Sequence, residues 1–99
     1  MAPKVSTANP VEIIKIHSRD IQLRFSVRRM GIFGSMARGD SKASSDLDIL
    51  IDMETPTFDG YMDLKFFLED LTGRDIDLVL DSALKPRLRR QIEREIIYV

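Results

Sequence analysis

Apolar residues in the first third of the chain recur first at helical and then at strand intervals. Between residues 10 and 24 they lie three, four and seven positions apart, directly after Asn9-Pro10, a pair typical of a helix start. Residues 26–33 are rich in apolar side chains and stop at a Gly-Ser pair, so we expect a strand there. Residues 35–39 have room for one helical turn. The pattern therefore predicts a helix, a strand and a short second helix.

The rest of the chain continues this alternation. Residues 46–51 and 75–80 alternate polar and apolar positions, which predicts two more strands. Between them, Asp59 is expected to cap a helix that ends at Gly73. A last helix is expected from Ser82 onward, because apolar residues there recur four positions apart.

These elements predict an α/β fold with a small mixed sheet of about three strands and flanking helices. Residues 10–99 are expected to form a single domain, preceded by a flexible N-terminus over residues 1–9. Tyr61, Phe66 and Phe67 lie at helical spacings, so we expect them in the core.

Two aspartates share one face of the second predicted strand. Side chains alternate along a strand, so Asp46 and Asp48 point to one side and the apolar residues around them to the other. At the usual strand rise their Cα atoms are about 6.6 Å apart, which lets both carboxylates converge on one cation. A divalent ion such as Mg²⁺ prefers oxygen ligands and relieves the repulsion between them. The same pattern also describes an edge strand with one solvated face.

The third predicted strand repeats this arrangement. Asp75 and Asp77 share one face of this strand, and Ile76, Leu78 and Leu80 point to the other. If the two acidic strands are neighbours, Asp77 lies beside Asp46 and Asp48. Three carboxylates on adjacent strands are typical of a two-metal site.

The Gly34-Ser35 pair is a candidate phosphate-binding turn. It follows an apolar strand and precedes a helical turn, where free backbone N–H groups and a serine hydroxyl bind phosphate. Glycine also lets a ligand approach the backbone closely. Arg38 follows within one turn and could contact a phosphate or pair with a nearby acid. Taken alone, the pair also describes an ordinary turn.

The two motifs together resemble a known family. The first motif is the run Gly-Ser-Met-Ala-Arg-Gly-Asp over residues 34–40, and the second is Asp46-Leu47-Asp48, separated from the Gly-Ser pair by ten residues. Together they are similar to the signature of minimal nucleotidyltransferases of the DNA polymerase beta superfamily. The likeness extends over residues 10–99 and implies a polymerase beta-like fold. One departure is Met36, which stands where the family often has arginine.

The resemblance implies a role for each matching residue. Asp46 and Asp48 would hold two Mg²⁺ ions, and Asp77 would complete the acceptor-side metal site and accept a proton. Gly34 and Ser35 would bind the β- and γ-phosphates of the nucleotide, and Arg38 would be a further phosphate contact.

The resemblance also implies a partner. Such proteins are often encoded beside an all-helical HEPN-like toxin and act as its antitoxin, in some cases by transferring AMP from ATP to a tyrosine of the toxin. An antitoxin that neutralises its partner by binding alone is the alternative, and an enzyme for a small molecule or RNA that lacks its second domain is a third. The 99 residues cover the catalytic core only, so a protein acceptor and a homo- or hetero-oligomer are expected.

Composition narrows the chemistry further. Cysteine is absent and His17 is the single histidine, which excludes disulfides, zinc–thiolate sites and cysteine nucleophiles. A cytoplasmic protein is therefore expected, and the longest apolar run, four residues, is too short for a membrane span. The net charge of −1 combines +5 over residues 1–39, −9 over residues 40–81 and +3 over residues 82–99. Nucleic acid is not a favoured partner at this charge, whereas the acidic centre suits a cation site.

Overall fold

The computed structural model describes residues 9–39 and 46–99. The flexible N-terminus predicted for residues 1–9 lies outside them except for Asn9, as does most of the spacer between the two motifs. The elements, in chain order, are α1 (Pro10–Phe25), β1 (Val27–Phe33), α2 (Ser35–Arg38), β2 (Leu47–Met53), α3 (Phe58–Thr72), β3 (Ile76–Leu80), the 3₁₀ turn η1 (Asp81–Ala83), α4 (Pro86–Glu93) and β4 (Ile97–Tyr98).

Local signals start and stop the two long helices. The Asn9 side chain accepts a hydrogen bond from the Val11 N–H at 2.8 Å, so it caps α1 as predicted. The cap of α3 is Thr57 and not Asp59, because the Thr57 hydroxyl accepts from the Gly60 N–H at 3.0 Å. Asp59 instead lies in the first turn, and Gly73 ends the helix in the left-handed conformation with φ 69°.

The strands form one mixed sheet in the order β3-β2-β1-β4, which confirms the predicted α/β class. β2 and β3 are parallel, and β1 is antiparallel to both β2 and β4. The sheet has four strands where about three were expected. The last helix begins at Pro86, not at Ser82 as expected, and stops at Glu93. The residues after it, β-branched Ile97 and aromatic Tyr98, pair with the free edge of β1, with Ile97 opposite Ile32.

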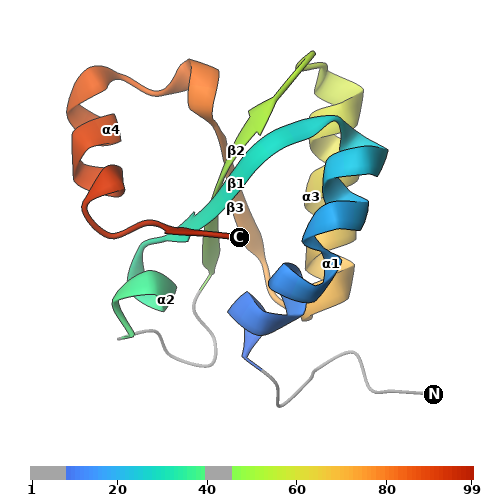
Figure 1. The fold of residues 1–99 in the computed structure, drawn as a ribbon, viewed down its shortest axis with the longest axis horizontal. Coiled ribbons are helices and arrows are strands. Elements are labelled where there is room, and N and C mark those ends of the chain that lie inside the picture. The colour runs from blue at the N-terminus through green and yellow to red at the C-terminus, as the bar shows by residue number, and fades with distance from the viewer. Residues whose placement is uncertain (1–8, 40–45) are drawn as a thin grey trace.

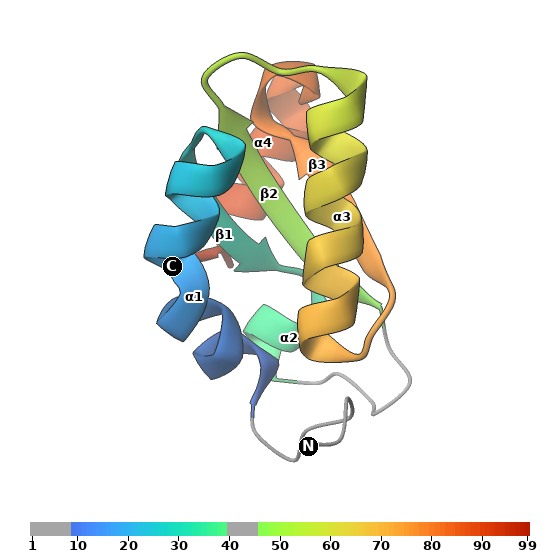
Figure 2. The same cartoon turned by 90° about the vertical axis from the view of Figure 1, so that its right-hand side faces the viewer.

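The hydrophobic core lies between one face of the sheet and the helices α1 and α3, which pack side by side over it (Figures 1 and 2). Leu47, Ile49 and Ile51 of β2 point into this layer and are fully buried, as the alternation predicted. Tyr61 and Phe67 pack against the core as expected, but Phe66 is 56 % exposed. All three aromatic residues lie at helical spacings, but only the packing of α3 decides which of them face solvent.

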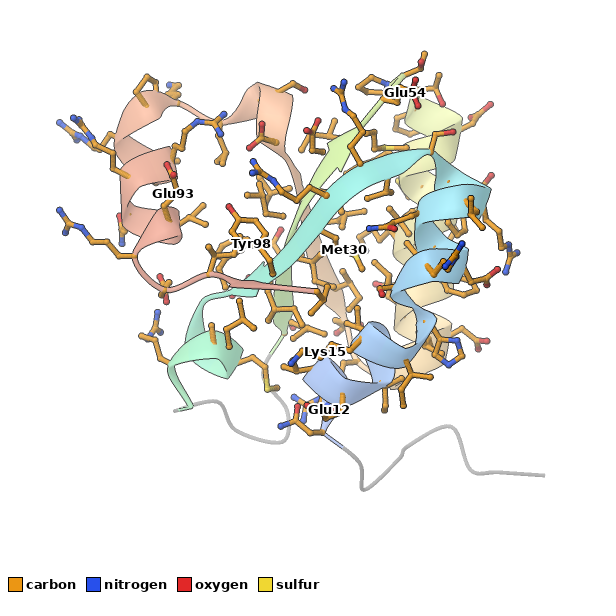
Figure 3. All side chains as sticks on the ribbon, viewed as in Figure 1. Glu12, Lys15, Met30, Glu54, Glu93 and Tyr98 are labelled. Atoms are coloured by element: carbon orange, nitrogen blue, oxygen red, sulfur yellow. The ribbon has the colours of Figure 1, made fainter. Side chains whose placement is uncertain are left out.

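The opposite face of the sheet carries the acidic side chains and is covered by α4 (Figure 1). Even-numbered residues of β2 and odd-numbered residues of β3 belong to it, because their neighbours fill the core. Figure 3 shows Met30 and Tyr98 on the two sides of β1, with Tyr98 on the α4 side. Arg29 lies over the Tyr98 ring at 5.0 Å, which ties β4 to this face. No helix among the described residues is long and apolar enough to cross a bilayer.

The cap assignment can be tested by three alanine variants. Thr57→Ala should lower the free energy of unfolding by about 1 kcal/mol, because it leaves the Gly60 N–H without its acceptor. Thr55→Ala, the same change in the exposed loop before it, should leave stability unchanged. Urea denaturation of each variant gives the comparison. A larger loss for Asp59→Ala than for Thr57→Ala would restore Asp59 as the cap.

Candidate active site

Two of the three predicted catalytic aspartates lie side by side. β2 and β3 are parallel, and their register places Asp48 directly opposite Asp77. Adjacent strands are about 4.8 Å apart, so side chains at paired positions on one face are in reach of each other. Asp77 is close enough to act on the Asp48 carboxyl group through its charge and through a hydrogen bond. The sheet order makes the two acidic strands neighbours, which is the condition on which Asp77 was expected to lie beside Asp46 and Asp48.

The pair perturbs the acidity of Asp48. Burial of its side chain is the largest cause, and the negative charge and hydrogen bond of Asp77 add to it. Together with weaker contributions from the charges of Asp46 and Glu95, they raise the pKa of Asp48 from 3.8 to about 6. A carboxylate whose pKa is raised this far, next to others of its kind, is typical of a functional site.

Asp46 lies one residue before β2 and is exposed. It is on the same side of the chain as Asp48, and the Leu47 N–H between them donates to the Asp75 carbonyl at 2.9 Å, which anchors this strand end to β3. Asp46 is near enough to act on Asp48 through its charge. The three aspartates thus belong to one end of the β2–β3 pair.

Gly34 brings the predicted phosphate-binding turn against Asp48. It has φ 75° and ψ −152°, a backbone conformation that residues with a side chain rarely adopt. A Cβ atom at this position would collide with the Asp48 carboxylate. Ser35 follows as the first residue of α2. The glycine therefore lets the turn pack directly against the Asp48 carboxylate, which a side chain at this position would prevent.

Arg38 is paired with an acid that the sequence analysis did not single out. Its Nη1 donates to Oε2 of Glu95 at 2.8 Å, and Glu95 lies in the turn after α4. The pairing of Arg38 with a nearby acid, one of the two roles expected for it, is therefore present. The contact of Arg38 with a phosphate stays a prediction. Glu95 also lies close enough to Asp48 to affect its pKa. In the sequence, only its position three residues after the apolar Ile92 could have indicated that Glu95 lies near the last helix.

The residues of the site fit Mg²⁺. Among the described residues, no three His, Cys, Asp or Glu side chains are grouped closely enough to hold a metal ion by themselves. Mg²⁺, however, takes few protein ligands and fills its remaining positions with water and substrate phosphate. Asp48 and Asp77 offer oxygen ligands whose mutual repulsion a cation would relieve. Asp46, Asp48 and Asp77 remain the predicted ligand set.

The arginines of α4 and of the turn after it have two different roles. Arg89 turns inward and donates to Oδ1 of Asp81 at 2.6 Å, which joins α4 to η1. Arg87, Arg90 and Arg94 line a surface hollow of about 500 Å³ together with a glutamine. Arg89 therefore has a structural role, whereas Arg87, Arg90 and Arg94 give this surface its positive charge.

Comparison with known proteins agrees with this geometry. The profile of a family described as nucleotidyltransferase domain matches residues 13–99. Protein adenylyltransferase MntA of Thermococcus cleftensis is 41% identical over 88 residues, which cover 88% of this chain and 89% of that protein. The resemblance drawn from the two motifs is therefore confirmed at the level of the family.

Solved structures agree with the fold. One assigned as a minimal nucleotidyltransferase has a TM-score of 0.77 and 35% identity, and the match covers 93% of this chain and 97% of that one. A second, a tri-AMPylated Shewanella oneidensis HEPN toxin in complex with MNT antitoxin, has a TM-score of 0.62 and 23% identity, with coverage of 91% and 67%. At that identity the second likeness concerns the fold alone.

The raised pKa of Asp48 predicts a pH-dependent stability. The folded protein holds this proton more tightly than the unfolded chain, so the contribution of Asp48 favours folding below pH 3.8 and is lost as the pH rises through about 6. The Asp48→Asn variant cannot ionise at this position, so it does not lose stability in this way as the pH rises. The free energy of unfolding of the variant, minus that of the wild type, should therefore rise between pH 5 and pH 8 by on the order of 1 kcal/mol, as measured by urea denaturation.

Asp52→Asn is the matched control for this measurement. Asp52 lies on the same face of β2, where its carboxylate pairs with Arg28 at 3.2 Å. Removing that carboxylate should not stabilise the protein at pH 8. Equal behaviour of the two variants would contradict the assignment of the perturbed proton to Asp48.

The space requirement at Gly34 predicts a second pair of variants. Gly34→Ala should cost about 1–3 kcal/mol of stability from backbone strain and a further loss from the collision with Asp48. Gly39→Ala supplies the control, because Gly39 also has a positive φ, 82°, but nothing described lies within 4 Å of the added carbon. Thermal denaturation should show the larger loss for Gly34→Ala, and equal losses would mean that Asp48 does not restrict this position.

Proposed function

The chain belongs to the nucleotidyltransferase domain family, and we propose that it transfers AMP from ATP to a hydroxyl group of a partner protein, with Mg²⁺ as cofactor. The single observation that carries the proposal is the pairing of Asp48 with Asp77 on adjacent strands, with the Gly34 turn packed against Asp48. Acidic side chains and a backbone turn are the groups that nucleotidyl transfer requires, and a chain without cysteine can supply them.

The reaction is an in-line displacement at the α-phosphorus of ATP. The acceptor oxygen forms a bond to this phosphorus, and the bond from it to the β-phosphate oxygen breaks. AMP is then attached to the acceptor, pyrophosphate leaves, and the acceptor proton passes to a carboxylate and on to water. Most of the catalysis comes from holding these groups in line and neutralising their charge.

Each group of the chain has a place in this reaction. Gly34 and Ser35 would bind the β- and γ-phosphates, which places the α-phosphate toward the carboxylates. Asp77 would receive the acceptor proton, and the pairing of β2 with β3 would hold it beside Asp48. Asp46, Asp48 and Asp77 would hold Mg²⁺, which when bound supplies positive charge to the phosphates and lowers the pKa of the attacking hydroxyl.

The comparisons favour a toxin as the protein acceptor. MntA of Thermococcus cleftensis is a protein adenylyltransferase, and a solved neighbour pairs an MNT antitoxin with a tri-AMPylated HEPN toxin. We carry this over as a proposal: the partner is a helical HEPN-like toxin, the acceptor is a tyrosine hydroxyl, and the complex forms in the cytoplasm. AMP on the toxin would add a bulky anionic group and block its activity.

Transfer of labelled AMP tests the proposal. Incubation with ATP labelled at the α-phosphate, Mg²⁺ and the HEPN-type product of the adjacent gene should label that product. Asp46→Asn combined with Asp48→Asn should reduce labelling at least 100-fold, because it removes the charge that would hold Mg²⁺. Asp52→Asn on the same strand face is the control and should retain labelling.

Protection of cells distinguishes catalysis from neutralisation by binding. If the double variant protects cells from the toxin as well as the wild type does, the protein acts by complex formation and the transfer is not its function. Labelling that survives the double variant would instead show that the carboxylate assignment is wrong.

A further inference from the structure

Large apolar side chains are exposed on the two helices that cover the core. In the described part of the chain, six such side chains are exposed, and four of them lie on α1 and α3. They are Ile16 and Leu23 of α1 and Phe58 and Phe66 of α3, each between 56 % and 77 % exposed. Single apolar side chains at a surface are ordinary, but several on neighbouring helices are typical of an interaction site.

The four side chains point away from the sheet. Ile16 and Leu23 are seven residues apart, about two turns, so they share one side of α1. Phe58 and Phe66 are eight residues apart, and the partly buried Met62 lies midway between them on the same side of α3. Each helix has fully buried residues two positions from its exposed ones, which is the opposite side of a helix. These buried residues are Ile14, Ile21, Leu64 and Leu68.

The exposed sides of α1 and α3 form one surface. Figure 2 looks onto this surface, with the two helices side by side and the sheet behind them. The rings of Phe25 and Phe67, 5.4 Å apart, join the helices to each other. The apolar side chains on this surface make up what we term the outer patch. Its members are Ile16, Leu23, Phe58, Met62 and Phe66.

The two helices that carry the outer patch differ in charge. α1 has three basic and two acidic residues, whereas α3 has one basic and four acidic residues, so α1 is net positive and α3 is net negative. Ion pairs within each helix join some of these charges. Arg19 of α1 and Asp59 and Asp63 of α3 are exposed and pair with no residue that the structure describes. Charges of both signs are therefore available to a partner.

Such a surface is complementary to itself. A two-fold axis parallel to the helices places α1 of one copy over α3 of the other, and the reverse contact forms at the same time. The positive helix then meets the negative helix twice, and Ile16 and Leu23 meet the aromatic side chains of the other copy. An axis across the helices would instead place the acidic α3 against α3, where like charges repel. A second copy of this chain, in the first of these arrangements, is the partner that the surface fits.

We propose that the outer patch is the interface of a homodimer in which α1 of each copy lies over α3 of the other. The inference goes beyond the proposed transfer of AMP and does not depend on it. The acidic face of the sheet and α4 lie on the side away from α1 and α3 (Figure 1). The dimer therefore leaves both candidate active sites accessible and directs them away from each other, so that each can meet its own acceptor protein.

Sedimentation equilibrium of the full chain tests the interface. The wild type should have twice the mass of one chain, and its dimer should dissociate on dilution. Leu23→Ser and Phe66→Ser should each raise the Kd of the dimer by about tenfold, because each removes an apolar side chain from the centre of the interface. Both side chains are exposed in the single chain, so circular dichroism should show that the variants are folded.

Leu88→Ser is the matched control. Leu88 is also an exposed leucine on a helix, but it lies on α4, on the other side of the sheet. The same substitution there should leave the Kd of the dimer unchanged.

Charge reversal on α3 tests the arrangement of the helices. Asp63→Lys should raise the Kd about two- to fivefold at low salt, because α3 then attracts the positive α1 less strongly. If α3 lay over α3 instead, the same variant would relieve repulsion and lower the Kd. A lowered Kd would therefore overturn the proposed arrangement.

Two further results would overturn the homodimer itself. One is a wild type that stays monomeric up to about 1 mM, or a dimer whose Kd neither serine variant changes. The other is a monomeric wild type whose binding to the HEPN-type protein is lost in Leu23→Ser and Phe66→Ser, which would assign the outer patch to that protein. Labelling with AMP is measured separately, so its failure would leave the homodimer in place.

Discussion

The parallel pairing of β2 with β3 is the contact on which the candidate site depends. It places two carboxylates opposite each other, an arrangement that electrostatic repulsion opposes. The reverse side of β2 supplies the compensating free energy. Leu47, Ile49 and Ile51 are fully buried there, and burial of each such side chain contributes roughly 1.5–3 kcal/mol. The repulsion is limited because Asp48 remains partly exposed, so the apolar layer prevails and holds the acidic groups together.

One face of the sheet forms the hydrophobic core and the other carries the aspartates, which explains how so small a domain can hold a charged site. The helices α1 and α3 cover only the apolar face, so the core does not require the other face to be apolar. The acidic face can then carry charged groups, and Gly34 lets the turn at residues 34–35 approach Asp48, because a side chain there would meet the carboxylate. Stability and site chemistry are therefore assigned to opposite sides of the same strands.

The α4 segment forms the third part of this arrangement. It is joined to the sheet through β4 and to α2 through the ion pair between Arg38 and Glu95. An exposed ion pair of this kind contributes at most about 1 kcal/mol, so it orients the segment more than it stabilises the fold. The helix thus covers the acidic face while a cavity remains beneath it, next to the carboxylates.

Much of the fold could be predicted from local pattern. The strand alternation identified which side chains of β2 face the core, and Asn9-Pro10 and Gly73 marked helix ends, because these signals depend on the residues a few positions away. Where two local signals competed, prediction was less exact: Thr57 caps α3 although Asp59 is an equally good capping residue. The exposure of Phe66 and the strand β4 depend on packing partners distant in sequence.

The sequence by itself determined the site's chemical groups: Gly34-Ser35 and the aspartates, at a spacing that identified the family. Only the tertiary structure decided which of them meet. The sheet order placed Asp48 against Asp77, and the return of the chain through α4 brought Glu95 to Arg38 and closed the cavity. The physical reason is that periodicity and capping are set by neighbours along the chain. Strand order and helix docking are set instead by burial summed over residues far apart in sequence.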